Sequence, residues 1–163
     1  MIELVNYSNK HIDSLINLLN NKNVSDWLVM VPYPYTKKDA KWWINHCKDA
    51  KNNKRDFLYA IENEEEHVGG ISLHKKFEHS AELGYWLGEP YWSKGYMFEA
   101  INNIIEFAFE DLKLIRVFAY VFEENIKSEN VLLKTGFLYE GLLKKCHKKG
   151  NKIFNSKVYA KVI

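Results

Sequence analysis

The sequence has little of what marks a disulfide-bonded, metal-binding or strongly charged protein. It contains only two cysteines, Cys47 and Cys146, without a C-x-x-C pair and without a His/Cys spacing typical of zinc sites. Two isolated thiols are typical of the reducing cytosol, so we expect a cytoplasmic protein that binds no metal. The formal net charge of +2 is too small to indicate a nucleic-acid partner.

Long apolar runs and a basic leader are missing as well. Ile-Glu-Leu follows the first methionine, and no apolar run approaches membrane-spanning length, so we expect a soluble protein with no membrane partner. Apolar residues make up 47% of the chain and aromatic residues 15%, which argues against disorder. No repeat, linker or shift of composition divides the 163 residues, and we predict a single domain over residues 1–163.

The spacing of the apolar residues predicts a mixed α/β sheet. Alternating β-forming residues predict strands at 2–7, 56–61, 68–73, 81–87, 115–122, 137–143 and 153–162. Three- and four-residue spacing predicts helices at 11–21, from Thr36 through Cys47, at 97–108 and at 125–135. Thr36 and Asp39 have the spacing of a capping box. Gly69-Gly70 indicates a bulge or a close approach of two segments of the chain.

Three other stretches are predicted to be irregular or exposed. Residues 23–35 contain two prolines and no periodicity, which argues against a helix or strand. We expect the acidic residues 62–66 to form a solvated turn without a function. Cys146-His147, in a lysine-rich stretch, is also interpreted as a solvated turn. None of the six histidines has a carboxylate and a Ser or Cys at a spacing that suggests a triad.

The stretch from Ala81 to Ala100 is the most informative part of the chain. A strand ends at Gly88 and Pro90, and a short loop containing Lys94 then leads directly into a helix. Free backbone N–H groups and the positive end of the helix dipole meet there, which favours a phosphate or pyrophosphate. The spacing matches neither a P-loop nor G-x-G-x-x-G. On spacing alone, a tight strand-to-helix connection is an equally good interpretation.

A family resemblance favours the anion site. Residues 84–100, GYWLGEPYWSKGYMFEA, resemble the coenzyme A loop of the GNAT superfamily of N-acetyltransferases, whose pattern is Gln/Arg-x-x-Gly-x-Gly/Ala. The resemblance is strongest to the ribosomal-protein N-terminal acetyltransferase branch and continues through residues 114–141, about half of the chain in all. Two positions depart from the pattern, because Trp92 replaces the Gln/Arg and Met97 replaces the second Gly/Ala.

The resemblance implies a GNAT fold with acetyl-CoA as the cosubstrate. That fold is a mixed, mostly antiparallel seven-stranded sheet flanked by about four helices. Its fourth and fifth strands splay apart to form the acetyl-CoA cleft. The residues expected to bind acetyl-CoA are Tyr85, Leu87, Trp92, Ser93, Lys94, Gly95, Tyr96, Met97, Asn125 and Ser128.

Acetyl transfer to an amine needs a base for the amine, a donor for the carbonyl oxygen and an acid for the thiolate. Glu82 is the candidate base, directly or through water, and its alternative reading is an outward-facing strand residue. The resemblance places the carbonyl donor near the backbone N–H of Leu87. It also places Asn125 on the pantetheine arm and the Ser128 hydroxyl near the sulfur, as the proton donor. The alternative reading is structural, with Asn125 as a helix N-cap and Ser128 at N3 of the same turn. Tyr139 and Tyr159 are alternative hydroxyls.

The acceptor is the least determined part of the prediction. Branch resemblance implies the N-terminal α-amine of a ribosomal or other protein. The aromatic residues Trp27, Tyr33 and Tyr35 of the irregular loop, with the terminal hairpin, are expected to line the acceptor pocket, and packing beneath the loop is their alternative reading. A small amine, such as a polyamine or an aminoglycoside, is the alternative substrate. A non-catalytic acyl-CoA-binding module is an alternative of a different class. Because no nucleophile is evident, we expect direct transfer, by a monomer or a homodimer.

Overall fold

The computed structural model describes residues 1–163 and contains one seven-stranded sheet, in the order β1-β2-β3-β4-β5-β7-β6. All neighbouring strands pair antiparallel except β4 and β5, which are parallel. The predicted mixed, mostly antiparallel sheet is therefore confirmed. The strands are β1 (Ile2–Asn6), β2 (Asp56–Asn63), β3 (Glu66–Phe77), β4 (Ser80–Leu87), β5 (Arg116–Phe122), β6 (Leu138–Lys149) and β7 (Lys152–Val162).

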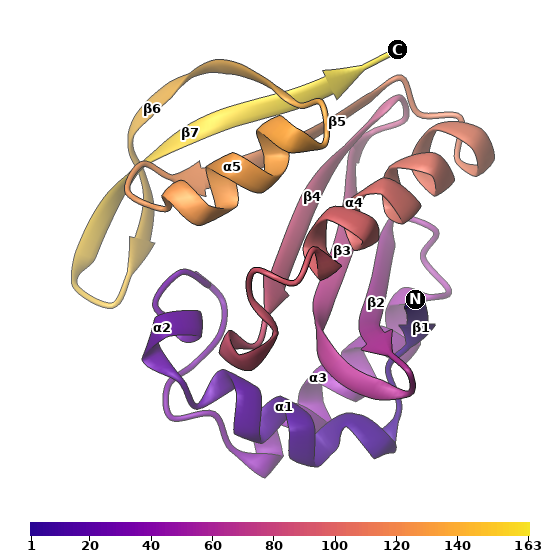
Figure 1. The fold of residues 1–163 in the computed structure, drawn as a ribbon, viewed down its shortest axis with the longest axis vertical. Helices are drawn as coiled ribbons and strands as arrows, with labels where there is room; N and C mark the ends of the chain where they lie inside the picture. Colours follow the sequence, from indigo (N-terminus) through magenta and orange to yellow (C-terminus); the bar gives the residue numbers. More distant parts are fainter.

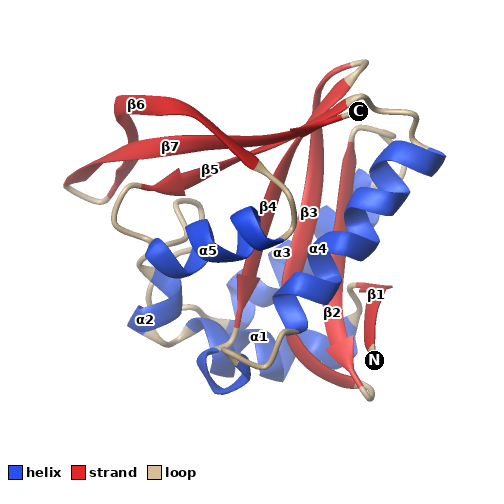
Figure 2. Cartoon of the chain, turned by 45° about the horizontal axis from the view of Figure 1, so that its top comes forward, coloured by secondary structure: helices blue, strands red, loops and turns tan.

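Helices cover both faces of this sheet (Figures 1 and 2). α4 and α5 pack on one face, and α1 and α3 pack on the other. None of the helices is both long and apolar enough to cross a lipid bilayer. The helices are α1 (Ile12–Leu19), α2 (Lys22–Ser25), α3 (Lys37–Ala50), α4 (Tyr96–Glu106) and α5 (Ile126–Lys134).

Local sequence signals explain several of these boundaries. The capping box is confirmed, because the Thr36 N–H donates to the Asp39 carboxylate at 2.7 Å at the start of α3. The short helix α2 overlaps the start of the stretch predicted to be irregular, which the prediction did not foresee, and it ends before the prolines. Close approach at the paired glycines is also confirmed, because a Cβ on Gly70 would lie 2.3 Å from the Tyr7 hydroxyl.

The splay between β4 and β5 is present (Figure 1). The two strands pair only at their beginnings, from Ser80 opposite Arg116 to Glu82 opposite Phe118. Beyond this point β4 continues to Leu87 beside β3, while β5 continues beside β7. The rest of β4 therefore has a free edge toward β5, as the family resemblance implied.

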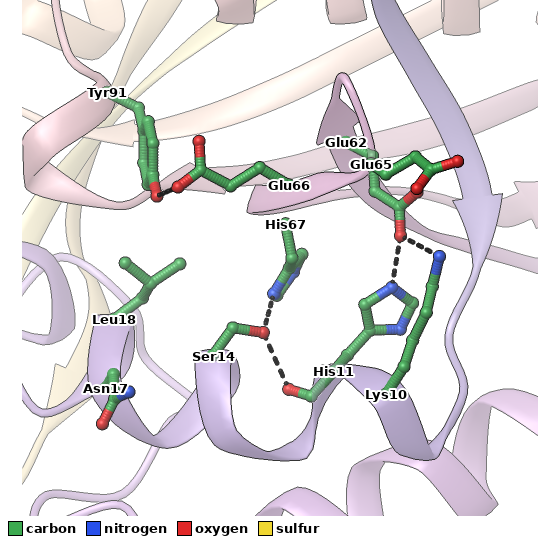
Figure 3. Close-up of a pocket in the computed structure, with 10 residues that line it drawn as sticks. All are labelled: Lys10, His11, Ser14, Asn17, Leu18, Glu62, Glu65, Glu66, His67 and Tyr91. Atoms are coloured by element: carbon green, nitrogen blue, oxygen red, sulfur yellow. Dashed lines mark hydrogen bonds and ion pairs between the residues drawn. The ribbon is translucent and has the colours of Figure 1, made fainter.

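The acidic stretch forms an exposed turn at Glu64 and Glu65, as predicted, but Glu62 does not belong to it. β2 continues to Asn63, and Glu62 is only 4% exposed. Its carboxylate pairs with Lys10 Nζ and with His11 Nε2, each at 2.7 Å (Figure 3). The prediction failed at Glu62 because the cations that allow this carboxylate to be buried come from the segment before α1, far away in the sequence.

The lysine-rich stretch around Cys146 is also a strand and not a turn. β6 extends to Lys149, and the hairpin reverses at Gly150. His147 packs its ring against Tyr120, with 5.3 Å between ring centroids, and bonds the buried Ser156 hydroxyl at 2.7 Å. Contact with β5 and β7 stabilises a strand that its composition did not indicate.

Candidate active site

The beginning of α4 has the features of an anion-binding site. Gly95 precedes the helix with φ +83°, a left-handed conformation that glycine adopts without strain. Because Glu99 makes the first bond of the helix, back to Gly95, the N–H groups of Tyr96, Met97 and Phe98 point out of its end. No atom lies within 4 Å of the place where a Cβ on Gly95 would stand, so this end is open to a ligand.

Lysines lie on both sides of the loop before α4. Lys94 Nζ lies 5.5 Å from the centre of the Tyr91 ring, and Lys127 Nζ lies 4.0 Å from the centre of the Trp92 ring. Sequence reasoning found Lys94 but missed Lys127, which comes from the first turn of α5. No local signal marks Lys127, because only the fold brings α5 beside this loop.

The free edge of β4 directs backbone groups into the gap toward β5. Gly88 N–H donates to the Val68 carbonyl of β3 at 2.9 Å. Residues of an antiparallel strand alternate in direction, so the backbone groups of Tyr85 and Leu87 point away from β3. The Trp92 indole N–H donates to the Leu87 carbonyl at 2.8 Å, which agrees with this direction. Trp92 thus lies folded back over the end of β4.

A hydroxyl pair bridges the gap from β4 to α5. The Tyr85 hydroxyl lies 2.6 Å from Ser128 Oγ and 3.2 Å from the Ser128 carbonyl oxygen. Asn125 caps α5, because its amide oxygen accepts the Ser128 N–H at 3.2 Å, and its Nδ2 group can still donate. Burial raises the pKa of Tyr85, so this phenol stays protonated at neutral pH. The fold thus brings together three of the residues predicted to bind acetyl-CoA.

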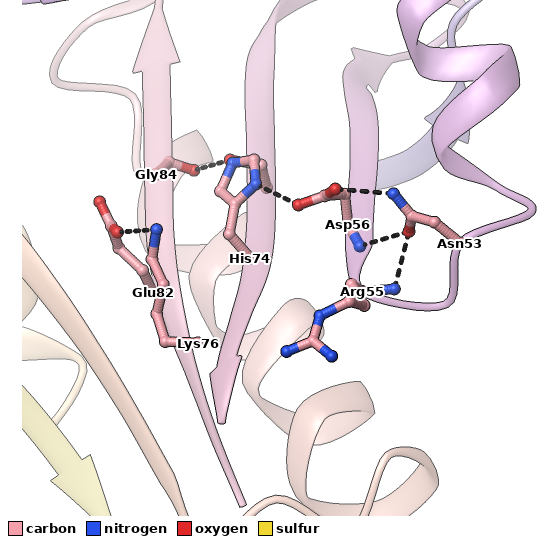
Figure 4. Close-up of polar contacts among 8 residues, drawn as sticks. Asn53, Arg55, Asp56, His74, Lys76, Glu82 and Gly84 are labelled. Atoms are coloured by element: carbon pink, nitrogen blue, oxygen red, sulfur yellow. Dashed lines mark hydrogen bonds and ion pairs between the residues drawn. The ribbon is translucent and has the colours of Figure 1, made fainter. Parts of the chain in front are cut away.

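Glu82 lies on the opposite side of β4 from this pair. Ala81 and Leu83 face the cluster beneath α4, whereas Trp86 packs toward α1 and α3. By alternation, Glu82 faces the side of α3, and its carboxylate lies 2.9 Å from Lys76 Nζ (Figure 4). The candidate base and the Ser128 hydroxyl therefore approach the gap from its two sides.

A Ser-His-Asp array lies beside Glu82, although the sequence showed no such spacing. His74 Nδ1 lies 2.7 Å from Asp56 Oδ1 (Figure 4). His74 Nε2 lies 3.1 Å from Ser72 Oγ. The three residues stand on β2 and β3, and strand pairing places Ser72 opposite Gly84 and His74 opposite Glu82. Cross-strand register creates this array, and sequence spacing within one segment cannot reveal it.

The three aromatic residues predicted to bind the acceptor differ in solvent exposure. Trp27 and Tyr33 are partly exposed, with 37% and 48% of their surfaces accessible. Tyr35 is 5% exposed and packs in the cluster beneath α1 and α3. Trp27 lies 6.3 Å from Phe122 of β5, between ring centroids, which places it near the end of β5.

Lys149 connects the tip of the β6–β7 hairpin to the segment that carries Trp27 by hydrogen bonds. Its ammonium group donates to the carbonyl oxygens of Ser25, of Leu28 at 2.6 Å and of Val31 at 3.3 Å. Three acceptors use the three donors of an ammonium group. Burial lowers the pKa of Lys149. The contact was not foreseen from the sequence, because it joins segments at opposite ends of the chain.

Known proteins are similar to this chain in sequence and in fold. The sequence model of the family described as "Acetyltransferase (GNAT) domain" matches residues 2–138. The uncharacterized N-acetyltransferase YnaD of Bacillus subtilis (strain 168) is 32% identical over 164 residues, covering 92% of this chain and 95% of that protein. The ribosomal-protein-serine acetyltransferase of Escherichia coli (strain K12) is 29% identical over 108 residues, covering 65% of this chain and 60% of that protein.

A solved structure gives the same result for the fold. The microcin C7 self-immunity acetyltransferase MccE, crystallised with acetyl-CoA and AMP, matches with a TM-score of 0.90 and 23% identity. The match covers 99% of this chain and 92% of that chain. At this identity the likeness shows the fold alone, and the family follows from the sequence matches. The chain therefore belongs to the GNAT acetyltransferase family and is an acetyl-CoA-dependent N-acetyltransferase.

Proposed function

We propose that this enzyme moves the acetyl group directly to the N-terminal α-amine of a protein. The observation that carries the proposal is the gap between β4 and β5. An anion-binding helix end lies at its mouth, a hydroxyl pair lies on one side, and carboxylate and imidazole groups lie on the other. This arrangement lets a thioester and an amine enter from opposite sides and meet within the gap.

The residues at the mouth of the gap fit coenzyme A. The free N–H groups at the start of α4, with Lys94 and Lys127, suit its diphosphate. The backbone groups of Tyr85 and Leu87 suit its pantetheine arm, and the amide of Asn125 can donate to the same arm. Acetyl-CoA supplies an activated acetyl thioester to this site.

The chain's own groups then act on the carbonyl oxygen and the sulfur. A backbone N–H of the free β4 edge near Leu87 stabilises the negative charge that develops on the carbonyl oxygen. Ser128 gives a proton to the departing thiolate, and Tyr85 replaces that proton through their 2.6 Å contact. Ser128→Ala is expected to lower kcat more than it changes the affinity for acetyl-CoA.

Glu82 acts on the amine from the other side of the gap. An α-amine has a pKa near 8, about 2.5 units below that of a lysine side chain, and so loses its proton more easily. The Glu82 carboxylate attracts the acceptor amine and accepts a proton from it as a base, directly or through water. Glu82→Gln is expected to lower kcat/KM for the amine and to leave acetyl-CoA binding unchanged.

Neither cysteine is placed to form an acyl-enzyme. Cys47 is buried in the cluster beneath α1 and α3, and burial raises its pKa to about 12. Cys146 is exposed on β6, an edge strand of the sheet. Cys47→Ala and Cys146→Ala are each expected to retain activity, as measured by thiol release from acetyl-CoA. Loss of turnover in a folded variant of either would contradict direct transfer.

Three observations support a protein N-terminus over a polyamine as the acceptor. One relative acetylates a ribosomal-protein serine, as its name states. On this chain, Lys144, Lys145 and Lys148 are exposed along β6, and their charge repels polycations. Trp27 and Tyr33 offer apolar contacts to peptide side chains near the end of β5.

A panel of acceptors tests this proposal. Thiol release from acetyl-CoA is measured with peptides that carry a free N-terminal serine, alanine or methionine, and with their N-acetylated forms as controls. Spermidine and kanamycin represent the small amines. Turnover with free but not with blocked peptides is expected. Turnover with spermidine or kanamycin alone would overturn the choice of acceptor. Tight acetyl-CoA binding without turnover on every amine would favour a binding module.

A further inference from the structure

The orientation of His74 is fixed by hydrogen bonds on β2. Asn53 accepts the N–H groups of Arg55 and Asp56 with its amide oxygen, at 2.8 and 3.0 Å, so its Nδ2 group faces the Asp56 carboxylate. Although burial pushes the pKa of Asp56 upward, hydrogen bonds from His74 and Asn53 outweigh it and hold this pKa below its ordinary value. The ionised carboxylate only accepts, so the proton of the neutral imidazole stands on His74 Nδ1.

This assignment leaves a lone pair on His74 Nε2, directed at Ser72. The Ser72 hydroxyl has one proton and two candidate acceptors, His74 Nε2 at 3.1 Å and the Gly84 carbonyl at 3.4 Å. The shorter bond to the imidazole is the better one. Donation to the imidazole leaves the lone pairs of Ser72 Oγ free to accept a proton from another group. Asp56, His74 and Ser72 therefore form a hydrogen-bonded chain along which a proton can pass from Ser72 to His74.

The chain ends at Ser72 on β3, beside Gly84 of β4 and one strand away from the gap between β4 and β5. Ser72 stands directly opposite Gly84, and a Cβ on Gly84 would lie 2.9 Å from Ser72 Oγ. The next residue, Tyr85, directs its backbone groups into the gap. The His74 and Asp56 side chains are 34% and 30% exposed, so water and an amine can reach this face. These residues stand on the side of the sheet that carries Glu82 (Figure 4).

We propose that Ser72, His74 and Asp56 are a proton relay for the acceptor amine, an inference that rests on the direct transfer proposed above. An N–H proton of the acceptor ammonium passes to Ser72 Oγ while the proton of Ser72 passes to His74 Nε2. The product is a neutral amine and an imidazolium beside the Asp56 carboxylate. The amine nitrogen then bonds to the acetyl carbon, and its second proton passes to Glu82, directly or through water. The carbon–sulfur bond breaks, and the thiolate takes a proton from Ser128, which is reprotonated through Tyr85 and solvent.

An imidazole suits this step better than a carboxylate does. A histidine has an ordinary pKa of about 6.5 and a glutamate one of about 4.3, so imidazole is the stronger base near neutrality. Glu82 is also engaged by Lys76 at 2.9 Å. The charged groups that face His74 are Asp56 on β2, Glu82 on β4 and Lys76 on β3, and His46 on α3 acts on Asp56. Glu82 helps by favouring the imidazolium.

The tautomer of His74 tests the relay without any acceptor. Long-range ¹H–¹⁵N spectra of the protein labelled at histidine nitrogens, recorded at pH 8, distinguish the two neutral forms. The relay requires a proton on Nδ1 and a free Nε2. Asp56→Asn, which can donate to Nδ1, is expected to move the proton to Nε2. A wild-type imidazole protonated on Nε2 would overturn the proposal.

Kinetics test whether the imidazole accepts the proton. The acceptor is a peptide with a free N-terminal serine. His74→Gln is expected to lower kcat/KM for this peptide by roughly 10²-fold. It should also abolish the acid limb of the pH profile, which is the fall of kcat/KM at low pH. The dissociation constant of acetyl-CoA should not change. His79→Gln, an exposed histidine at the β3–β4 turn, is the matched control. Glu82→Gln should keep the acid limb, because the imidazole of His74 is still present.

The outcomes separate the relay from the choice of acceptor. An unchanged acid limb in folded His74→Gln would overturn the relay. If His74→Gln does not fold, Asp56→Asn and Ser72→Ala carry the same comparison. If the wild-type protein acetylates spermidine but no peptide, the acceptor proposal fails and the same variants are compared with spermidine. If no amine is acetylated, the tautomer alone decides for or against the relay.

Discussion

Gly95 is the residue on which the coenzyme A site depends most directly. Its φ of +83° turns the chain into α4, and the space before it is open. Gly95→Ala adds strain of about 1 kcal/mol and places a methyl group where the diphosphate would approach. We expect a weaker affinity for acetyl-CoA, measured by isothermal titration. Gly150→Ala is the control, because it has φ +56° in an open turn of the β6–β7 hairpin. Equal affinities in the two variants would contradict the proposed site.

Tyr85 is the other single residue with a distinct expected effect. Tyr85→Phe removes the hydroxyl that lies 2.6 Å from Ser128 Oγ and leaves the ring in place. A lost hydrogen bond of this kind costs about 1 kcal/mol of stability. We expect kcat to fall while the dissociation constant of acetyl-CoA stays the same, as measured by stopped-flow and steady-state kinetics. Tyr139→Phe, an exposed tyrosine on β6, should behave as wild type. A normal kcat in Tyr85→Phe would remove Tyr85 from the proton path.

At the scale of elements, the β6–β7 hairpin and the segment after α2 form one unit. Lys149 joins them by donating to three carbonyl oxygens between Ser25 and Val31. Trp27 lies within that segment, so the position of the hairpin tip controls the position of this aromatic side chain. The proposed acceptor surface thus depends on a strand from one end of the chain and a loop from the other.

Replacement of this lysine tests that dependence. Lys149→Met keeps the aliphatic chain but removes all three donors, and we expect a higher KM for the acceptor peptide with an unchanged KM for acetyl-CoA. In Lys149→Arg the KM for the acceptor peptide should rise less, since a guanidinium can donate to several carbonyls. Lys148→Met, on the same strand, is the matched control. A rise in KM for acetyl-CoA instead would mean that the hairpin supports the other side of the gap.

At the scale of the whole molecule, a buried polar network joins the turn before α1, α1 itself and the β2–β3 hairpin (Figure 3). His11 donates to Glu62 at 2.7 Å, and His67 contacts Ser14 at 2.7 Å and the Gly69 carbonyl at 2.8 Å. A polar pocket of about 280 Å³ lies against these groups. Burial, with the nearby His11, lowers the pKa of His67 to about 4.

This pKa predicts how stability depends on pH. His67 binds a proton below pH 6.5 when unfolded but only near pH 4 when folded, so stability is lost as the pH falls through this window. The loss is about 2 kcal/mol at pH 5. Urea unfolding of wild type and of His67→Gln at pH 7 and pH 5 measures it. We expect a smaller loss in His67→Gln and the wild-type loss in His79→Gln. Equal losses in all three proteins would show that other groups cause it.

Much of the fold could be predicted from the sequence, because the signals are local. Alternation and helical spacing are set by neighbouring residues, and so are the capping box at Thr36 and the glycine before α4. The strand–loop–helix from Ala81 to Ala100 contains its own anion site, since the helix end supplies the N–H groups. Family resemblance added the splay of β4 and β5, which periodicity could not show.

Contacts between distant segments were decided by the tertiary structure alone. Glu62 is buried because Lys10 and His11 reach it, and His74 meets Asp56 and Ser72 because strand pairing aligns them. Such groups carry no local signal, since burial and hydrogen bonding depend on partners that only the folded chain supplies. The sequence by itself determined the strands, the helices and the helix end that suits a diphosphate. Only the register of the sheet decided which polar side chains face the gap where transfer is proposed.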